Sequence, residues 1–423
     1  MRTMMQNKLT QPEILAPAGD WERFEAALDF GADAVYLGGT QFGMRAASAK
    51  FTPELLEKAT RLAHQRGKRV YLTCNTLPRN QEIPLFEGFL EQAVACQVDA
   101  LIVADLGLLA LVRQYAPDMP IHMSTQTGIV NYAAANQLYQ MGASRVVLAR
   151  ELSLDEIAEI RAKTPKELEI EAFVHGAMCM SFSGRCLLSS YLTNRDANRG
   201  ACSQPCRWSY HLMEEKRPGQ FFPVFEDEQG SYILNAKDLC MLPYLDKVVE
   251  AGVDSLKIEG RMKTALYVAT VARTYRKAID DYFTSEELYR SHMDWYKEEI
   301  SKCTYRQFTT GFYFGKPDEN TQIYDNNTYV NEYIYLGMIE EAKPEKGLVR
   351  ITQRNKFCVG DTIEIMKPSG ENVEVKVEEM FDGEGNAVES APHPQQEIWL
   401  RLSVMPDVQD ILRVGNRKDA MPE

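Results

Sequence analysis

The stretch Glu250-Ala-Gly-Val-Asp-Ser-Leu-Lys-Ile-Glu-Gly260 decides the fold that we expect for this chain. It contains a helix end, a small residue, an aspartate and then a short, mostly apolar strand. Two earlier stretches repeat this order: LDFGADAVYLGG at residues 28–39 and CQVDALIVAD at residues 96–105. A recurring unit is typical of folds built from repeated supersecondary elements. The recurrence therefore predicts quasi-repeated βα units.

Short apolar strands alternate with amphipathic helical stretches through the first 175 residues. This alternation indicates a parallel sheet that helices cover on its outer face. The strands predicted there are Glu13–Pro17, Ala34–Gly38, Arg69–Asn75, Ala100–Asp105, Ile121–Gln126, Arg145–Ala149 and Leu168–His175. Val253–Glu259 adds an eighth strand. Eight βα units favour a closed, TIM-like (β/α)8 barrel. An open doubly wound sheet is the alternative.

The predicted barrel is interrupted once, by Gly176–Gly252, between its seventh and eighth strands. Insertions at the carboxyl ends of barrel strands build active sites. Two helical patterns follow the eighth strand, Lys263–Phe283 and Ser285–Lys302. From about Tyr329 the apolar period becomes two, which predicts a small antiparallel β-barrel. We therefore expect two domains: residues 1–326, with the insertion and the trailing helices, and residues 327–423.

Charge and hydropathy exclude several classes of protein. The formal net charge is −13, and Val330–Glu423 holds 11 Lys and Arg against 18 Asp and Glu. A nucleic-acid contact would therefore need a local basic surface. The first residues have no apolar core of a signal peptide, and no apolar run approaches a membrane span. The sequence predicts a cytoplasmic protein without a membrane partner.

The cysteines are concentrated in the insertion. Five of the nine are Cys179, Cys186, Cys202, Cys206 and Cys240. Four thiolates hold an iron–sulfur cluster or a structural zinc ion, but these spacings lack the paired C-x2-C hooks of a zinc ribbon. Residues 179–208 also hold four arginines and a single acid, which suits an anionic cluster. Chemistry alone leaves open which four cysteines are ligands, and unrelated buried thiols are the alternative.

Four long stretches resemble the collagenase-like peptidases of unassigned family thirty-two. Two are HGAMCMSFSGRCLLSSYLTNRDANRGACSQPCRW at residues 175–208 and DSLKIEGRMKTALYVATVARTYRKAID at residues 254–280. The others are EILAPAGDWERFEAALDFGADAVYLGG at residues 13–39 and RNKFCVGDTIEIMKP at residues 354–368. The resemblance covers essentially the whole chain, and its motifs are long and specific.

The resemblance implies an oxygen-independent hydroxylation protein with a [4Fe–4S] cluster. Carried over residue by residue, the cluster ligands fall on Cys179, Cys186, Cys202 and Cys240, which leaves Cys206 as an extra thiol. One branch of the family is similar to proteins required for 5-hydroxyuridine at the wobble position of tRNA, with prephenate as the implied hydroxyl source. This chain looks most like that branch in length and in its C-terminal domain. Other branches act on ribosomal RNA cytidine or on ubiquinone precursors. Some relatives work as two-component systems, so a paralogous partner protein is expected.

Charged residues near the carboxyl ends of the predicted strands are the other candidates for the site. Strand alternation places Lys257 and Glu259 on one face, either as catalytic groups or as an ion pair that fills a barrel layer. His175 directly precedes the cysteine loop and is a candidate proton donor; a histidine bonded to backbone is the alternative. The arginines that we expect to clamp the carboxylates of prephenate are Arg45, Arg150 and Arg261.

Two other functions stay open at this point. A peptidase would need a catalytic constellation, yet the chain has neither an H-E-x-x-H pair nor a G-x-S-x-G elbow. A nucleophilic pair of Cys179 and His175 is an alternative to cluster ligation. The third hypothesis is that the chain is a non-catalytic subunit that presents RNA or substrate to a partner.

Overall fold

The computed structural model describes residues 10–43, 51–178, 188–193, 195, 203, 235–316, 322–323 and 330–416. The chain packs into two compact units. The first is made of Met1–Phe24, Ala32–Met262 and Arg306–Thr328. The second is made of Glu25–Gly31, Lys263–Tyr305 and Tyr329–Glu423. Within the described part of the chain, no helix is long and apolar enough to cross a membrane.

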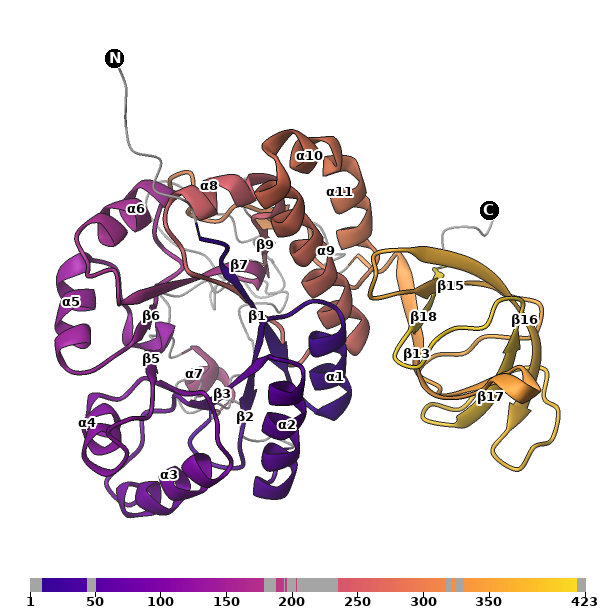
Figure 1. The fold of residues 1–423 in the computed structure, drawn as a ribbon, viewed down its shortest axis with the longest axis horizontal. Helices are drawn as coiled ribbons and strands as arrows, with labels where there is room; N and C mark the ends of the chain where they lie inside the picture. The colour runs from indigo at the N-terminus through magenta and orange to yellow at the C-terminus, as the bar shows by residue number, and fades with distance from the viewer. Residues whose placement is uncertain are drawn as a thin grey trace, which may run out of the picture. The chain divides into compact units, whose positions relative to one another are not determined.

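The first unit is a closed barrel of eight parallel strands, which confirms the predicted fold (Figure 1). Each strand pairs with the next in the chain, and β10 closes the ring by pairing with both β7 and β1. The barrel strands are β1 (Glu13–Ala18), β2 (Ala34–Gly38), β3 (Arg69–Cys74), β4 (Ala100–Val103), β5 (Ile121–Met123), β6 (Arg145–Val147), β7 (Glu169–Ala177) and β10 (Ser255–Ile258). Because these strands are almost completely buried, their sequences are nearly continuous apolar runs.

Helices connect successive strands on the outside of this ring (Figure 1). Capping side chains define several of the starts: Thr52, Asp105, Asn131 and Ser153 each accept a hydrogen bond from a backbone N–H of the first helical turn. The helices that follow β1 to β6 are α1 (Trp21–Asp29), α2 (Pro53–Gln65), α3 (Phe86–Ala95), α4 (Leu106–Tyr115), α5 (Tyr132–Gln140) and α6 (Leu154–Ala162).

The aspartate of the sequence repeat has one structural task in all three copies. The carboxylates of Asp33, Asp99 and Asp254 each accept a hydrogen bond from the backbone N–H of a neighbouring strand. The distances are 2.9, 2.7 and 2.8 Å. Each aspartate stands just before its own strand, so it fixes the register between two strands. The turn before the third copy requires glycine, because Gly252 has φ +82° and a Cβ there would lie 2.5 Å from Cγ of Arg161.

Two further strands extend the same sheet, one from the insertion after β7 and one from the later segment Arg306–Thr328. β9 (Asp238–Cys240) pairs antiparallel with the end of β7, and β11 (Phe308–Thr309) pairs with β9. The other helices and β-strands described within the insertion are α7 (Leu188–Thr193), β8 (Asn235–Ala236) and α8 (Leu245–Glu250). β12 (Gln322–Ile323), from a later part of the chain, pairs antiparallel with β8. The chain returns through α8 to the last barrel strand.

The second unit begins with helices α9 (Ala265–Thr284), α10 (Glu286–Ser291) and α11 (Met293–Ser301). The sequence predicted one helix over Ser285–Lys302, and this is wrong, because two helices meet at His292. The imidazole of His292 lies 2.8 Å from the carboxylate of Asp281 in α9. Tyr296 donates a hydrogen bond to the same carboxylate. These two contacts to Asp281 fix the start of α11 against α9, and we attribute the break between α10 and α11 to them.

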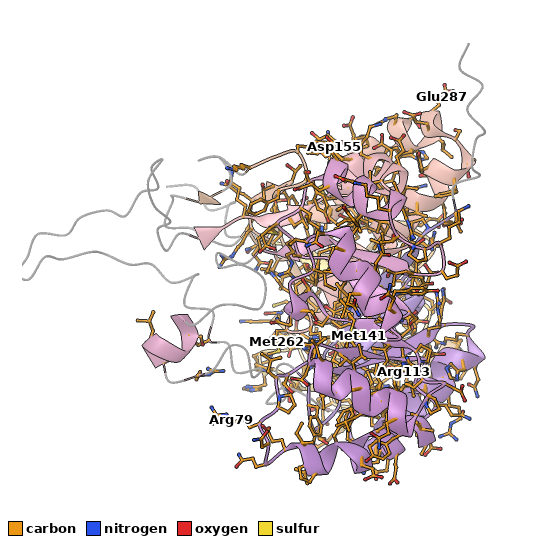
Figure 2. All side chains as sticks on the ribbon, turned by 90° about the vertical axis from the view of Figure 1, so that its left-hand side faces the viewer. Arg79, Arg113, Met141, Asp155, Met262 and Glu287 are labelled. Atoms are coloured by element: carbon orange, nitrogen blue, oxygen red, sulfur yellow. The ribbon has the colours of Figure 1, made fainter. Side chains whose placement is uncertain are left out.

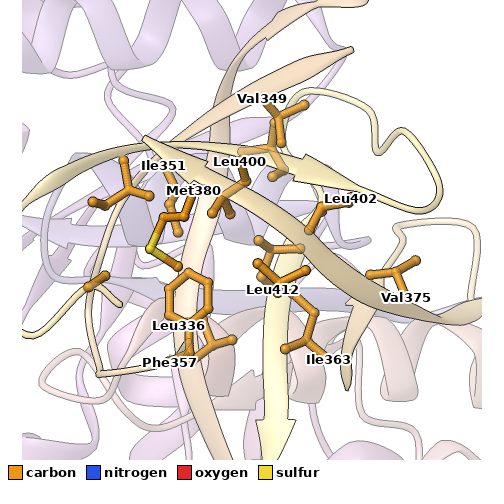
Figure 3. Close-up of a cluster of buried hydrophobic side chains, with 14 of the residues drawn as sticks. Leu336, Val349, Ile351, Phe357, Ile363, Val375, Met380, Leu400, Leu402 and Leu412 are labelled. Atoms are coloured by element: carbon orange, nitrogen blue, oxygen red, sulfur yellow. The ribbon is translucent and has the colours of Figure 1, made fainter. Parts of the chain in front are cut away.

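The C-terminal strands form a second closed barrel, which is antiparallel and confirms the predicted fold class. Its strands are β13 (Tyr333–Lys343), β14 (Leu348–Thr352), β15 (Thr362–Met366), β16 (Asn372–Asp382), β17 (Glu397–Leu402) and β18 (Ile411–Gly415). The long strand β13 pairs with both β14 and β18. Its Gly337 has φ +156°, and a Cβ there would lie 3.0 Å from the Thr352 carbonyl oxygen. Aliphatic side chains, Met380 and Phe357 fill this barrel (Figure 3).

Candidate functional site

The candidate site lies at the carboxyl ends of the parallel strands. Arg79 follows β3 and Met262 follows β10, and Figure 2 shows both side chains at the same edge of the molecule. The cysteine-bearing insertion also leaves the barrel from the carboxyl end of β7. Loops at this end of a parallel barrel carry the active site in enzymes of this fold.

The opposite end of the barrel interior holds a buried ionic network. Nη1 of Arg145 lies 2.8 Å from Oε1 of Glu13 and 3.0 Å from Oε2 of Glu171. Tyr71 and Ser255 donate hydrogen bonds to the two oxygens of Glu13, at 2.7 and 2.9 Å. Burial alone would raise the pKa of Glu13, but Arg145, Arg69 and the Tyr71 hydroxyl together outweigh burial and lower that pKa below its usual value. Each buried charge therefore has a partner.

Lys257 extends this network toward the middle of the barrel. Its Nζ lies 2.5 Å from Oε1 of Glu171, and only 5% of the residue is exposed. The same Nζ lies 4.6 Å from the ring centre of Tyr36 and 5.6 Å from that of Phe173. The sequence placed Lys257 and Glu259 on one face of the strand, and each of them has an ion-pair partner on another element.

Arg150 and Glu259 meet near the carboxyl ends of the strands. Nη2 of Arg150 lies 3.5 Å from Oε2 of Glu259, and its guanidinium lies 3.8 Å from the ring centre of Phe173. Arg261 lies on the loop after β10, where its Nη1 donates a hydrogen bond of 3.2 Å to Oγ1 of Thr73. Two of the three predicted arginines thus reach the carboxyl end of the barrel from different strands.

His175 and Cys240 lie opposite each other in the β7–β9 pair. Both are buried. The His175 ring lies 5.5 Å from the ring of Phe308, and its backbone oxygen accepts a hydrogen bond of 2.9 Å from the N–H of Glu259. Cys240 therefore lies beside the strand from which the loop carrying Cys179 departs.

The described residues suit an iron–sulfur cluster in one respect. The buried thiol of Cys240, a residue type that can bind iron, lies at the carboxyl end of the barrel beside the end of β7. Cys179, Cys186, Cys202 and Cys206 lie outside the described residues, and so does Arg45. Within the described ranges, no three His, Cys, Asp or Glu side chains gather in a way that could hold a metal ion.

Sequence reasoning did not single out Glu13, Tyr36, Arg145, Glu171 or Phe173. A signal was present for Glu171, because Glu169 and Glu171 alternate with apolar residues in β7. A charge within a buried strand indicates an inward-facing partner on another strand. Glu13 and Arg145 each stand first in their strands, a position that also suits a solvated residue.

Two barrels define the class of this protein: a parallel (β/α)8 barrel with a cysteine-bearing insertion at its carboxyl end, and an antiparallel six-stranded barrel. The chain belongs to peptidase family U32. The profile of this family matches residues 19–323, and the profile of the peptidase family U32 C-terminal domain matches residues 331–413. The family resemblance seen in the sequence motifs is thereby confirmed.

Three relatives align with nearly the whole chain. "tRNA hydroxylation protein P1" of Bacillus subtilis is 36% identical over 405 residues, which cover 96% of this chain and 95% of that protein. "tRNA hydroxylation protein P" of Escherichia coli is 38% identical over 431 residues, which cover 92% and 93%. "Collagenase" of Porphyromonas gingivalis is 34% identical over 380 residues, which cover 87% and 89%. The family thus contains proteins with two kinds of names.

Proposed function

We propose that this protein is an enzyme that hydroxylates uridine at carbon five in the wobble position of tRNA. The observation that carries the proposal is the similarity to two tRNA hydroxylation proteins over more than nine-tenths of the chain. The similarity includes both barrels, because the alignments cover nearly all of each protein. Fold alone would not support this function, since (β/α)8 barrels serve many reactions.

Our proposal includes a [4Fe–4S] cluster on Cys179, Cys186, Cys202 and Cys240. When bound, such a cluster supplies electron transfer or Lewis-acid activation without molecular oxygen. The position of Cys240 beside the end of β7 supports this ligand set, because Cys179 follows β7 directly. This chain's own contribution is to hold the thiolate ligands at the carboxyl end of the barrel.

Prephenate is the proposed hydroxyl donor, with its two carboxylates bound by arginines. Arg150 and Arg261 support this role, since guanidinium groups bind carboxylates through paired hydrogen bonds. Arg45, which follows β2 in the sequence, is proposed as a third contact. Glu259 would hold Arg150 in place through their ion pair. His175 is proposed to hold or move a proton beside Cys240.

The decisive experiment is mass spectrometry of tRNA nucleosides from a deletion strain. We expect 5-hydroxyuridine derivatives to disappear and the wild-type gene to restore them. Cys240→Ser should fail to restore them, whereas Cys303→Ser, which alters a buried thiol of the second unit, should succeed. Unchanged nucleosides in the deletion strain would refute the proposed function.

The cluster is tested separately on anaerobically purified protein. A protein that holds a cubane cluster is brown, with a broad absorption band at about 400 nm. We expect this band for the wild type and for Cys303→Ser, and its loss for Cys202→Ala and Cys240→Ser. A colourless wild-type protein without iron, prepared from cells that load other iron–sulfur proteins, would count against the cluster.

A peptidase is the second candidate function, favoured by the similarity to a protein named collagenase. It predicts gelatin cleavage by metal-free protein and normal tRNA in the deletion strain. A third possibility is a non-catalytic subunit that presents RNA to a paralogous partner protein. In that case the deletion strain would lose the modified nucleoside, but the purified protein would need the partner for hydroxylation in vitro.

A further inference from the structure

Lys257 has the surroundings of a reactive amine rather than those of a solvated lysine. It stands inside the parallel barrel on β10, with Glu171 at 2.5 Å and the rings of Tyr36 and Phe173 nearby. A buried ion pair is a poor source of stability, because desolvating both charges offsets most of their attraction. Two apolar side chains of similar volume would fill the same layer without this desolvation, so packing alone does not explain the Lys257–Glu171 pair.

We propose that Lys257 forms an imine with the ketone of a 2-oxo acid, and that this bond holds the hydroxyl donor. The inference rests on the proposed function, because prephenate carries a 2-oxo acid side chain. Nζ forms a double bond to the carbonyl carbon, and the carbonyl oxygen leaves as water. An ammonium group and a ketone thus give a protonated imine and water. No oxidant or reductant is needed, and hydrolysis reverses the step.

Glu171 is placed to assist the reaction. An ammonium group must lose a proton before its nitrogen can attack a carbonyl. Oε1 of Glu171 is within hydrogen-bond distance of Nζ and is in position to receive this proton. Arg145 bonds the other oxygen of Glu171, so the carboxylate is held in a fixed orientation. The protonated imine keeps a positive charge opposite Glu171, and the ion pair is not lost when the bond forms.

The carboxylate of a 2-oxo acid is attached directly to its ketone carbon, so it needs a cation close to the lysine. Lys257 and Arg150 both lie against the Phe173 ring, with Nζ 5.6 Å and the guanidinium 3.8 Å from its centre. Lys257 and Arg261 both lie against the Tyr36 ring, with Nζ 4.6 Å and the guanidinium 5.8 Å from its centre. Only 5% of Lys257 is exposed, which limits the access of water that would hydrolyse the imine.

The test is reductive trapping of the full-length, anaerobically purified protein with pyruvate and sodium cyanoborohydride, without tRNA. Peptide mass spectrometry should locate a reduced pyruvyl adduct on Lys257. We expect labelling about tenfold or more above that of the half-exposed Lys247. Lys257→Arg keeps a cation opposite Glu171 but cannot form an imine, so its adduct should vanish. Lys247→Arg should leave the labelling of Lys257 unchanged.

Labelling of Lys257 that does not exceed that of Lys247 would overturn the proposal and leave Lys257 as a structural ion pair. This comparison uses wild-type protein only, so it holds even if Lys257→Arg folds poorly. Because no tRNA is present, the result is independent of the nucleoside experiment. An adduct on Lys257 in a protein whose deletion leaves tRNA unchanged would disprove the tRNA function but keep the imine. Loss of the modified nucleosides without an adduct on Lys257 would support the tRNA function and disprove the imine.

Discussion

The two barrels of this chain are filled in opposite ways. The interior of the parallel barrel contains Glu13, Arg145, Glu171 and Lys257, each at most 7% exposed. The buried cluster of the antiparallel barrel consists of aliphatic side chains with Met380 and Phe357 (Figure 3). Hydrocarbon cores stabilise a fold through the area they remove from water. Charged interiors contribute little net stability, but they can bind ligands and move protons.

The apolar interior of the antiparallel barrel mainly stabilises the fold, whereas the charged interior of the parallel barrel holds groups that can take part in chemistry. In the apolar core of the antiparallel barrel, another apolar side chain of similar volume serves nearly as well, because packing is the main requirement there. In the parallel barrel each group depends on particular partners: Glu171 bonds both Arg145 and Lys257. Removing one partner leaves a charge buried without compensation. The two barrels should therefore respond differently to substitution and to pH.

The largest effect is expected from Arg145→Met in the parallel barrel. The change leaves Glu13 and Glu171 without their shared cation in a site where Arg145 is 1% exposed. We expect a loss of about 4 kcal/mol in the free energy of unfolding, measured by urea titration followed by circular dichroism. Arg69→Met is the matched control, since Arg69 contacts the same Glu13 but is 48% exposed. Its expected loss is at most about 1 kcal/mol.

Equal losses for these two variants would break the comparison. They would mean that burial does not decide the contribution of an arginine to Glu13, and that the interior of the parallel barrel behaves as a solvated surface. A smaller loss for Arg145→Met than for Arg69→Met would have the same meaning.

A somewhat smaller effect is expected from Leu400→Ala in the antiparallel barrel. Leu400 is fully buried in β17, and its removal leaves a cavity that neighbours fill only in part. We expect a loss of about 3 kcal/mol by the same urea titration. Val404→Ala alters an exposed valine just beyond the same strand and should cost at most about 0.5 kcal/mol. A loss for Leu400→Ala no larger than that of Val404→Ala would show that this core is loosely packed.

The sequence predicted local features well because local residues determine them. Helix α6, for example, begins where Ser153 and Glu156 form a capping box, and both residues are adjacent to that start in the sequence. The aspartates of the repeat marked the starts of strands because each carboxylate accepts a backbone hydrogen bond there. Fold class follows from such repeated local units.

Features that depend on distant partners were not predictable. Arg413 in strand β18 is an example, because its side chain is fully buried against Glu364 and Glu299, which lie on other elements. In the same way, Lys257 finds Glu171 on another strand of its barrel. A sequence shows that a charge stands in a strand, but the partner is known only when the strands are placed side by side.

The pH dependence of stability should sharpen the comparison. Burial raises the pKa of Glu13, but Arg145 and Arg69 lower it further, so its folded pKa lies below the unfolded one. The stability from Glu13 is therefore present above the unfolded pKa and lost as pH falls through the folded pKa. Glu13→Gln should cost about 2 kcal/mol at neutral pH. This difference from wild type should shrink as the pH falls below the ordinary glutamate pKa of about 4.3 and on through the lower folded pKa of Glu13.

Urea titrations at neutral and acidic pH measure this difference directly. A gap between wild type and Glu13→Gln that stays constant as the pH falls would mean that the Glu13 carboxylate contributes no charge-dependent stability. The network around Arg145 would then be held together by shape and neutral hydrogen bonds.

The smallest effect is expected from Ile365→Val, which removes one methylene group from the antiparallel barrel. Ile365 is fully buried in β15, where it pairs with Val373 and Leu412. We expect a loss of about 1 kcal/mol by urea titration. Because the change touches no titratable group, the loss should be the same at neutral and at acidic pH, unlike that of Glu13→Gln. A loss that varied with pH would show that the antiparallel core is coupled to ionisable groups and would remove the contrast between the two barrels.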